Sequence, residues 1–206
     1  MSQITQPAIL MVSMEPPASL EEEFNDWYDT EHFPQRRALP GFRSASRWVC
    51  LEGWPRWMAL YDLESQDALH TEAYVAVSGA HSTPWSRRIL PRTVGRSRVS
   101  ATSIARFHAN EQLTPEATAR LLVASIPPTS QGESAQDLFH TVREALSVRA
   151  DLLQLSGFIE ENGKLWLFAA FDAPVSTASL AAQIGRPRGC GISTFNLYMP
   201  YLRSTY

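Results

Sequence analysis

Two titratable side chains stand next to each other in the sequence, and their types are suited to acid–base chemistry. Glu31 and His32 end the motif that begins with Trp27, Tyr28 and Asp29. A carboxyl group of raised pKa beside a titratable imidazole is an arrangement that general acid–base catalysis requires. We therefore take His32, Glu31, Tyr28 and Asp29 as candidate catalytic residues.

A helix must position these groups. On a wheel of about 100° per residue, Phe24 and Trp27 define an apolar stripe, and Asp29 lies on the solvated face. Glu31 falls in the apolar stripe, where a carboxylate needs a partner or becomes protonated. Pro34 disfavours helical geometry at the preceding residue, so the helix should end near there. If it ends earlier, Glu31 is an exposed or capping residue instead.

Partners for Glu31 and roles for His32 stay open. Candidate partners of Glu31 are His32 and three basic residues, Arg36, Arg37 and Arg47. The imidazole could be catalytic or ligand-binding, or it could serve only to stabilise the end of the helix dipole. A metal site is disfavoured because no second histidine lies nearby, and we expect neither a metal nor another cofactor.

The chain repeats one order of elements, which predicts two similar halves. Short apolar strands end in paired prolines at residues 10–17 and 122–128. A helix with a capping signal follows each strand, at Ser19 with Glu22 and at Ser134 with Asp137. Then come predicted hairpins (42–51 with 56–63, and 152–159 with 164–172), helices (67–77 and 177–184) and last strands (94–107 and 191–202). Trp57 in the first closing strand is matched to Trp166 in the second.

Each half therefore reads β-α-β-β-α-β, the ferredoxin-like order. The closing strands are apolar on both faces, so each sheet needs a cover on the face without helices. We expect an α+β chain of tandem ferredoxin-like repeats whose antiparallel sheets pack into one barrel within the chain. The predicted divisions are 1–108 for the half with the motif, 109–119 for a linker and 120–206 for the second half.

Composition excludes several classes of protein. The hydrophobic content is 44%, with 19% charged residues and a net charge of −3. These values favour a globular core and give no electrostatic footprint for nucleic acid.

Cys50 and Cys190 fit no zinc pattern; two buried thiols are favoured, with a disulfide left open. The start lacks the features of a signal peptide and no apolar run would span a membrane, so we expect a cytoplasmic protein.

The residues from Phe24 to Pro34, the Pro40-Gly41-Phe42 turn, Arg47-Trp48 and the strand Ala59–Leu63 resemble the EthD-like branch of the dimeric α/β-barrel superfamily. The resemblance covers about residues 8–108. It implies ferredoxin-like sheets that pair into a barrel, as subunits usually do in relatives. It also implies a cleft between sheet and helices that the motif histidine faces.

The favoured function is cofactor-independent lyase, isomerase or cyclase chemistry on a small hydrophobic carbonyl compound. His32 would be the general acid or base, and Tyr28 or an arginine would stabilise an oxyanion. Expected substrate-binding residues are Arg47, Trp48, Tyr61 and Trp85. The alternatives are non-catalytic binding of a small ligand or haem, and a structural role for the motif.

The second half lacks the motif, because its first helix reads Gln136-Asp137-Leu138-Phe139-His140. We therefore expect one functional cleft per chain, with the second half acting as a built-in partner. A further association into a homodimer stays open.

Overall fold

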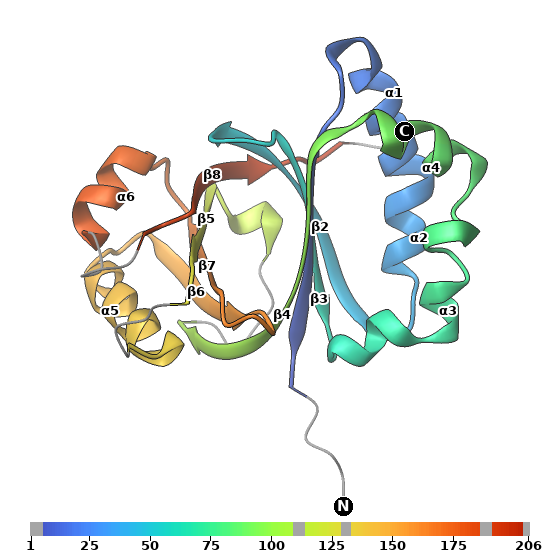
Figure 1. Cartoon of the computed structure of the whole chain (residues 1–206). Helices are drawn as coiled ribbons and strands as arrows, with labels where there is room; N and C mark the ends of the chain where they lie inside the picture. The colour runs from blue at the N-terminus through green and yellow to red at the C-terminus, as the bar shows by residue number, and fades with distance from the viewer. Residues whose placement is uncertain (1–5, 109–113, 129–132, 186–190, 204–206) are drawn as a thin grey trace, which may run out of the picture.

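The computed structural model describes residues 6–108, 114–128, 133–185 and 191–203, shown as a coloured ribbon in Figure 1. Its strands form one closed antiparallel barrel in the order β1-β3-β2-β8-β5-β7-β6-β4. The strand bounds are Ala8–Glu15 (β1), Phe42–Glu52 (β2), Trp57–Leu63 (β3), Val94–Phe107 (β4), Arg120–Ile126 (β5), Leu152–Ile159 (β6), Leu165–Phe171 (β7) and Thr194–Pro200 (β8).

Helices cover the barrel on two opposite sides (Figure 1). The α-helices are Glu21–Trp27 (α1), Phe33–Arg37 (α2), Glu72–Val75 (α3), Pro84–Ile89 (α4), Ala135–Ser147 (α5) and Thr177–Ile184 (α6). A π-helical turn, Tyr28–His32, joins α1 to α2. Short 3-10 turns are Ala18–Leu20, Gln66–His70, Gly79–His81, Leu90–Arg92 and Pro115–Ala117.

The expected fold class is confirmed, and the strand order shows how the two sheets meet. Strands β4-β1-β3-β2 form one ferredoxin-like sheet and β8-β5-β7-β6 the other. Their edges pair at two seams, β2 with β8 and β4 with β6. Because every strand has two neighbours, the barrel leaves no free edge. The boundary predicted at 109–119 stays a prediction, since residues 109–113 lie outside the described ranges.

Three hydrophobic clusters correspond to the three layers. One cluster draws side chains from all eight barrel strands, including Ile9, Trp48 and Trp166, and so fills the barrel. A second lies under α5 and α6. The third lies between the first-half helices and the outer face of β1 to β3. Strand β7 is buried at every position because its two faces belong to different clusters.

Of the two predicted helix starts one is confirmed and one is wrong, and one predicted helix is broken in the structure. The capping box at Ser134 is present, with Asp137 bonding back to the Ser134 backbone. The capping box expected at Ser19 is wrong. The 3-10 turn Ala18–Leu20 moves the N-cap of α1 to Leu20, whose side chain makes no capping hydrogen bond. The helix expected over 67–77 is broken at Thr71, whose hydroxyl caps the short helix α3.

The match drawn between the closing strands is also wrong in detail. Trp57 faces the helices, whereas Trp166 points into the barrel. Side chains alternate between the faces of a strand, so the four-residue spacing of Trp57 and Tyr61 keeps both on one face. Trp166 and Phe171 are five residues apart and point to opposite faces.

Cys50 is a free thiol, and Cys190 lies outside the described residues. In the part of the chain that the structure describes, no helix is both long enough and apolar enough to cross a bilayer.

Gly157 tests how tightly the second-half core is packed. A Cβ added there would stand 2.7 Å from the Phe139 ring. We expect Gly157→Ala to lower the free energy of unfolding by about 1–3 kcal/mol, the usual cost of overpacking. Gly191→Ala is the control, because its Cβ would meet nothing within 4 Å. Urea denaturation of the two variants checks this; equal stabilities would contradict the packing.

Candidate active site

The motif lies on one continuous helix that contains a wide turn. The Phe33 N–H bonds to the Tyr28 carbonyl five residues earlier, which is the π-helical pattern. Pro34 sits in the first turn of α2, where a missing N–H costs little, and the helix runs on to Arg37. The expectation that the helix stops near Phe33 is therefore wrong.

The wide turn also changes which side chains face inward. It places the His32 ring 4.5 Å from the Trp27 ring and 5.2 Å from the Tyr28 ring. A regular wheel puts His32 to the side and Glu31 in the apolar stripe. Glu31 instead accepts a hydrogen bond of 2.5 Å from Thr83, the N-cap residue of α4.

His32 carries a neutral imidazole, and the residue is only partly exposed to water. Burial, together with smaller contributions from the nearby cations of Arg36 and Arg47, lowers its pKa to about 3. Its Nδ1 atom is buried and has no hydrogen-bond partner. A neutral ring with a free nitrogen can accept a proton or bind a donor.

Other buried polar atoms without a partner lie on residues that are linked to His32 through Tyr28 and Arg36. They are the hydroxyls of Tyr28 and Tyr61, Nη1 of Arg36 and the hydroxyl of Ser78. With His32 Nδ1 they form what we call the polar cluster, and they complete the set of such atoms found in the described residues. Leaving each atom unpaired costs about 1–3 kcal/mol, so the cluster calls for a bound partner.

Charge and protonation in the cluster are set by burial. Burial raises the pKa of Tyr28, and it raises that of Tyr61 well above its ordinary value. Both phenols therefore stay protonated, and their hydroxyls couple electrostatically without forming a well-aligned hydrogen bond. Arg36 donates from Nη2 to the Val77 carbonyl at 2.7 Å, which leaves Nη1 free to donate elsewhere.

Asp29 does not face water, contrary to the wheel. It forms a short ion pair with Arg47 on β2, and the two side chains are 10% and 4% exposed. Arg47 also donates to Asn25 at 2.8 Å. Its guanidinium lies 4.4 Å above the Tyr28 ring and 4.6 Å from that of Tyr201. Asp29 therefore holds Arg47 and does not orient the imidazole.

A cavity of about 650 Å³ opens beside this ion pair. Its lining includes Asp29 and Arg47 from the predicted site, with Phe33 on the helix and Ala45 on β2. Tyr201, Leu202 and Arg203, which follow β8, supply another wall. Arg203 forms ion pairs with Asp26 at 2.7 Å and with Asp29 at 3.4 Å. A residue of the second half of the chain therefore contacts the motif helix of the first half.

The aromatic residues expected to line one pocket are distributed over different places. Trp48 points into the barrel, where its indole donates to Ser46. Tyr61 faces the helices and belongs to the polar cluster. Trp85 packs at the rim of the helix-side core and donates to Glu23 at 3.0 Å. These three residues therefore do not share a cavity, and of them Tyr61 is the one that interacts with Tyr28 and Arg36.

Arg36 was predicted only as a possible partner of Glu31, and Ser78 was not predicted at all. A signal for Arg36 was present, because Tyr28, His32 and Arg36 recur every four residues along one helix. Ser78 lies between short helices that no periodic pattern predicts. Asn25, the second anchor of Arg47, is a polar residue next to the apolar stripe.

Comparison with known proteins identifies the fold. No family model matches the chain, and no curated protein matches it. Solved structures do match. A mutant chlorite dismutase from Candidatus Nitrospira defluvii is 8% identical with a TM-score of 0.64, over 97% of this chain and 93% of that one. The chain has the dimeric α/β-barrel fold.

Two more barrels are similar to this one. A haem-binding protein from Thermus thermophilus is 11% identical with a TM-score of 0.56, over 95% of this chain and 91% of that one. An anthrone oxidase-like protein is 8% identical with a TM-score of 0.59, over 96% and 92%. The resemblance to the dimeric α/β-barrel superfamily is thus confirmed at the level of fold. The EthD-like branch stays a prediction from the motif.

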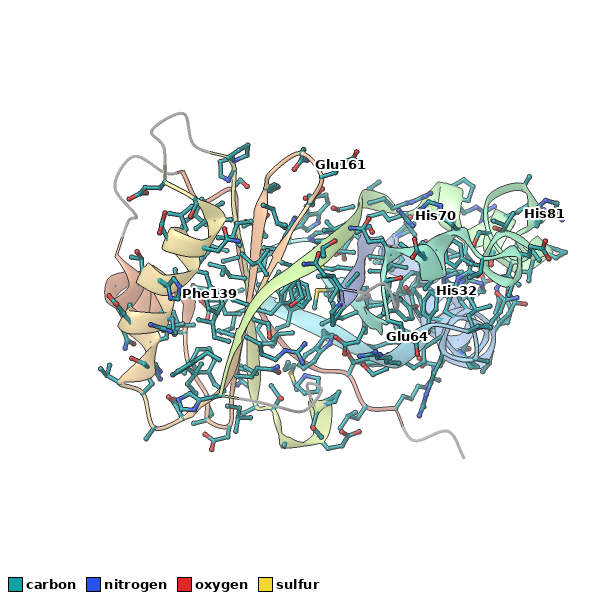
Figure 2. The ribbon with its side chains drawn as sticks, turned by 90° about the horizontal axis from the view of Figure 1, so that it is seen from below. His32, Glu64, His70, His81, Phe139 and Glu161 are labelled. Carbon is teal, nitrogen blue, oxygen red and sulfur yellow. The ribbon has the colours of Figure 1, made fainter. Side chains whose placement is uncertain are left out.

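The two sides of the barrel differ in chemistry. Figure 2 shows His32 and Phe139 on opposite sides of it. Helix α5 buries Leu138, Phe139, Val142 and Leu146 in a cluster of apolar residues, and His140 points to solvent. Each of the five unpaired buried polar atoms belongs to the motif half.

The described residues do not fit haem. Haem iron needs a histidine, cysteine, methionine or tyrosine facing a large cavity. Among the residues lining the 650 Å³ cavity only Tyr201 is of such a type. Burial raises its pKa and so disfavours the phenolate that binds iron. Nor do three or more metal-binding side chains converge anywhere in the described ranges.

The buried imidazole predicts a pH dependence of stability. In the unfolded chain His32 should bind a proton near pH 6.5, whereas in the fold its pKa is about 3. Between these values the unfolded state binds more protons, so stability falls as the pH falls. We expect the wild type to lose about 2 kcal/mol more than His32→Gln between pH 6.5 and pH 5. Urea denaturation at each pH checks this; parallel curves would contradict it.

The buried ion pair predicts that removing the charge of Asp29 lowers the stability of the protein much more than removing the charge of Asp26. Asp29→Asn leaves the buried Arg47 cation without its counter-charge, which should cost about 3–5 kcal/mol. Asp26→Asn is the matched control, because Asp26 is 44% exposed and forms its ion pair with Arg203 at the surface; it should cost less than about 1 kcal/mol. Thermal and urea denaturation compare the two, and similar losses would argue against a buried role for Asp29.

Proposed function

We propose that the protein binds a small, mainly hydrophobic carbonyl compound at the polar cluster and transfers a proton to or from it. The observation that carries the proposal is the set of unpaired polar atoms on Tyr28, His32, Arg36 and Tyr61. A ligand oxygen held by these donors would supply the missing hydrogen bonds. The reaction class is lyase, isomerase or cyclase chemistry.

His32 is the proposed proton acceptor. Its ring stays neutral throughout the physiological range because burial and two nearby cations depress its pKa. A neutral imidazole accepts a proton at once, although its low pKa makes it a weak base. It therefore suits a substrate hydrogen that is already acidic, such as one between two carbonyl groups.

The cluster also offers donors for a developing negative charge. Arg36 presents a free N–H, and the Tyr28 and Tyr61 hydroxyls stay protonated. Donors fixed in a dry site stabilise an enolate more than water does. Enolate formation is then assisted by the same arginine that depresses the histidine pKa.

The surroundings favour an apolar ligand body. Phe24, Trp27 and Tyr28 form a packed aromatic group, with ring centroids 5.1–5.8 Å apart, along the helix face above β1 to β3. Small-molecule sites commonly combine apolar walls with a few polar groups that orient the ligand. Proton transfer between such groups needs no cofactor.

Hydrogen exchange in D₂O tests the proposal without knowledge of the natural substrate. Small cyclic 1,3-diketones and β-keto esters would be incubated with the protein, and loss of the α-proton followed by NMR. We expect faster exchange than in buffer, and a rate lowered by about 10²–10⁴-fold in His32→Gln, the usual contribution of a general base.

His140→Gln is the matched control, because that histidine is exposed on α5. It should exchange protons at the wild-type rate. Full exchange activity in His32→Gln, or no acceleration by the wild type on any compound of the panel, would refute proton transfer by His32.

Non-catalytic binding at the same cluster is the second candidate, and one observation favours it. The carboxylates expected to assist the imidazole are engaged elsewhere, Glu31 with Thr83 and Asp29 with Arg47. Trp27, whose ring lies 4.5 Å from that of His32, should report occupancy. Stoichiometric quenching of tryptophan fluorescence by a panel compound that is recovered without exchange would favour binding alone.

A further inference from the structure

We infer that the ligand of the polar cluster is a keto acid, and that Arg98 on β4 binds its carboxylate. The inference rests on the proposed function for the place where the ligand binds, and it adds the chemical class of that ligand. It also assigns a recognition role to a residue outside the motif.

Tyr74 on α3 links Arg98 to the cluster. The Arg98 Nη2 atom lies 3.4 Å from the Tyr74 hydroxyl, and the Arg36 guanidinium lies 5.3 Å from the centre of the Tyr74 ring. Arg36 belongs to the polar cluster through its unpaired Nη1 atom. Two guanidinium groups therefore contact one tyrosine, and one of them is buried while the other is exposed.

The charges of these two arginines are not neutralised by the described residues. Every ion pair found among those residues involves other arginines. The pKa of Arg36 is lowered, mainly by burial and in smaller part by the like charge of Arg98. A carboxylate bound to Arg98 would offset this repulsion, and hydrogen bonds between arginine and carboxylate are among the strong ones in proteins.

The sheet offers an internal comparison, because an arginine stands at each end of one row of paired residues. Arg98 on β4 pairs with Val12 on β1. Val12 pairs with Ala59 on β3, and Ala59 pairs with Arg47 on β2. Side chains of paired residues lie on the same face of a sheet, which is here the side of the first-half helices. Asp29 neutralises Arg47 at one end of the row, and the carboxylate of the ligand would neutralise Arg98 at the other.

A keto acid suits both kinds of donor. The planar fork of an arginine matches a carboxylate, with which it can form two parallel hydrogen bonds. Arg36 Nη1 and the hydroxyls of Tyr28 and Tyr61 remain for the carbonyl oxygen, as in the proposed reaction. The ligand is therefore expected to place its negative charge beside β4 and its carbonyl group beside the motif helix.

A matched pair of ligands tests the charge without knowledge of the natural substrate. Binding of para-acetylbenzoate and of its methyl ester, which share an aromatic ketone and differ in the ionised group, would be measured by NMR titration at neutral pH. We expect the wild type to bind the acid at least about tenfold more tightly than the ester, the usual effect of a charge-assisted hydrogen bond. Arg98→Gln should abolish this preference, and Arg98→Lys, which keeps the charge without the fork, should keep part of it.

Arg96→Gln and Arg37→Gln are the matched controls. Arg96 is exposed on the same strand as Arg98, and Arg37 is exposed on the same helix as Arg36. Both variants lose the same charge as Arg98→Gln and should keep the wild-type preference. Arg37 also lines the 650 Å³ cavity, so a preference lost in Arg37→Gln and kept in Arg98→Gln would place the carboxylate in that cavity and overturn the inference. Urea denaturation confirms that each variant is folded.

The outcomes separate the inference from the proposed reaction. A wild type that binds the acid no better than the ester, or does not bind it, would overturn carboxylate recognition by Arg98 and leave proton transfer by His32 intact. A preference that survives in Arg98→Gln would do the same. A preference that depends on Arg98, together with no proton exchange on the panel of diketones and keto esters, would support the carboxylate site and refute the proposed reaction.

Discussion

The Arg47 guanidinium is the charge around which the motif half is organised. It is almost fully buried, and Asp29, Asn25 and the rings of Tyr28 and Tyr201 surround it. A buried cation needs partners on every side. The partners of Arg47 come from the motif helix and from the segment after β8, so its contacts hold both of these segments against strand β2. The same positive charge helps to keep His32 neutral.

Much of the fold could be predicted from the sequence because alternation and turn signals are local. The strand Leu152–Ile159 and the helix Thr177–Ile184 have the predicted bounds. The way the sheets join could not be read in the same way, because seam pairs such as Val49 with Met199 lie far apart in the chain. Trp57 and Trp166 looked equivalent until strand register assigned them to opposite faces.

The site was predicted less well, for a physical reason that begins at one turn. The sequence singled out His32 and Tyr28, and both lie at the polar cluster. Their roles stay predictions. A helical wheel of constant pitch misplaced Glu31 and Asp29 because it does not allow for the π-helical turn. The hydrogen bond from the Phe33 N–H to the Tyr28 carbonyl defines that turn, and the residue types do not predict it. The position of Arg36 could be predicted from the same helix once the π-helical turn is taken into account.

The wide turn makes the motif more sensitive to length than to composition. Removing one residue between Tyr28 and His32 would restore regular helical pitch and rotate everything after the cut by about 100°. His32, Phe33 and Arg36 would then lose their present contacts together, although every side chain would still be present. A relative of this chain should therefore be recognised by the number of residues between its tyrosine and its histidine before their neighbours are compared.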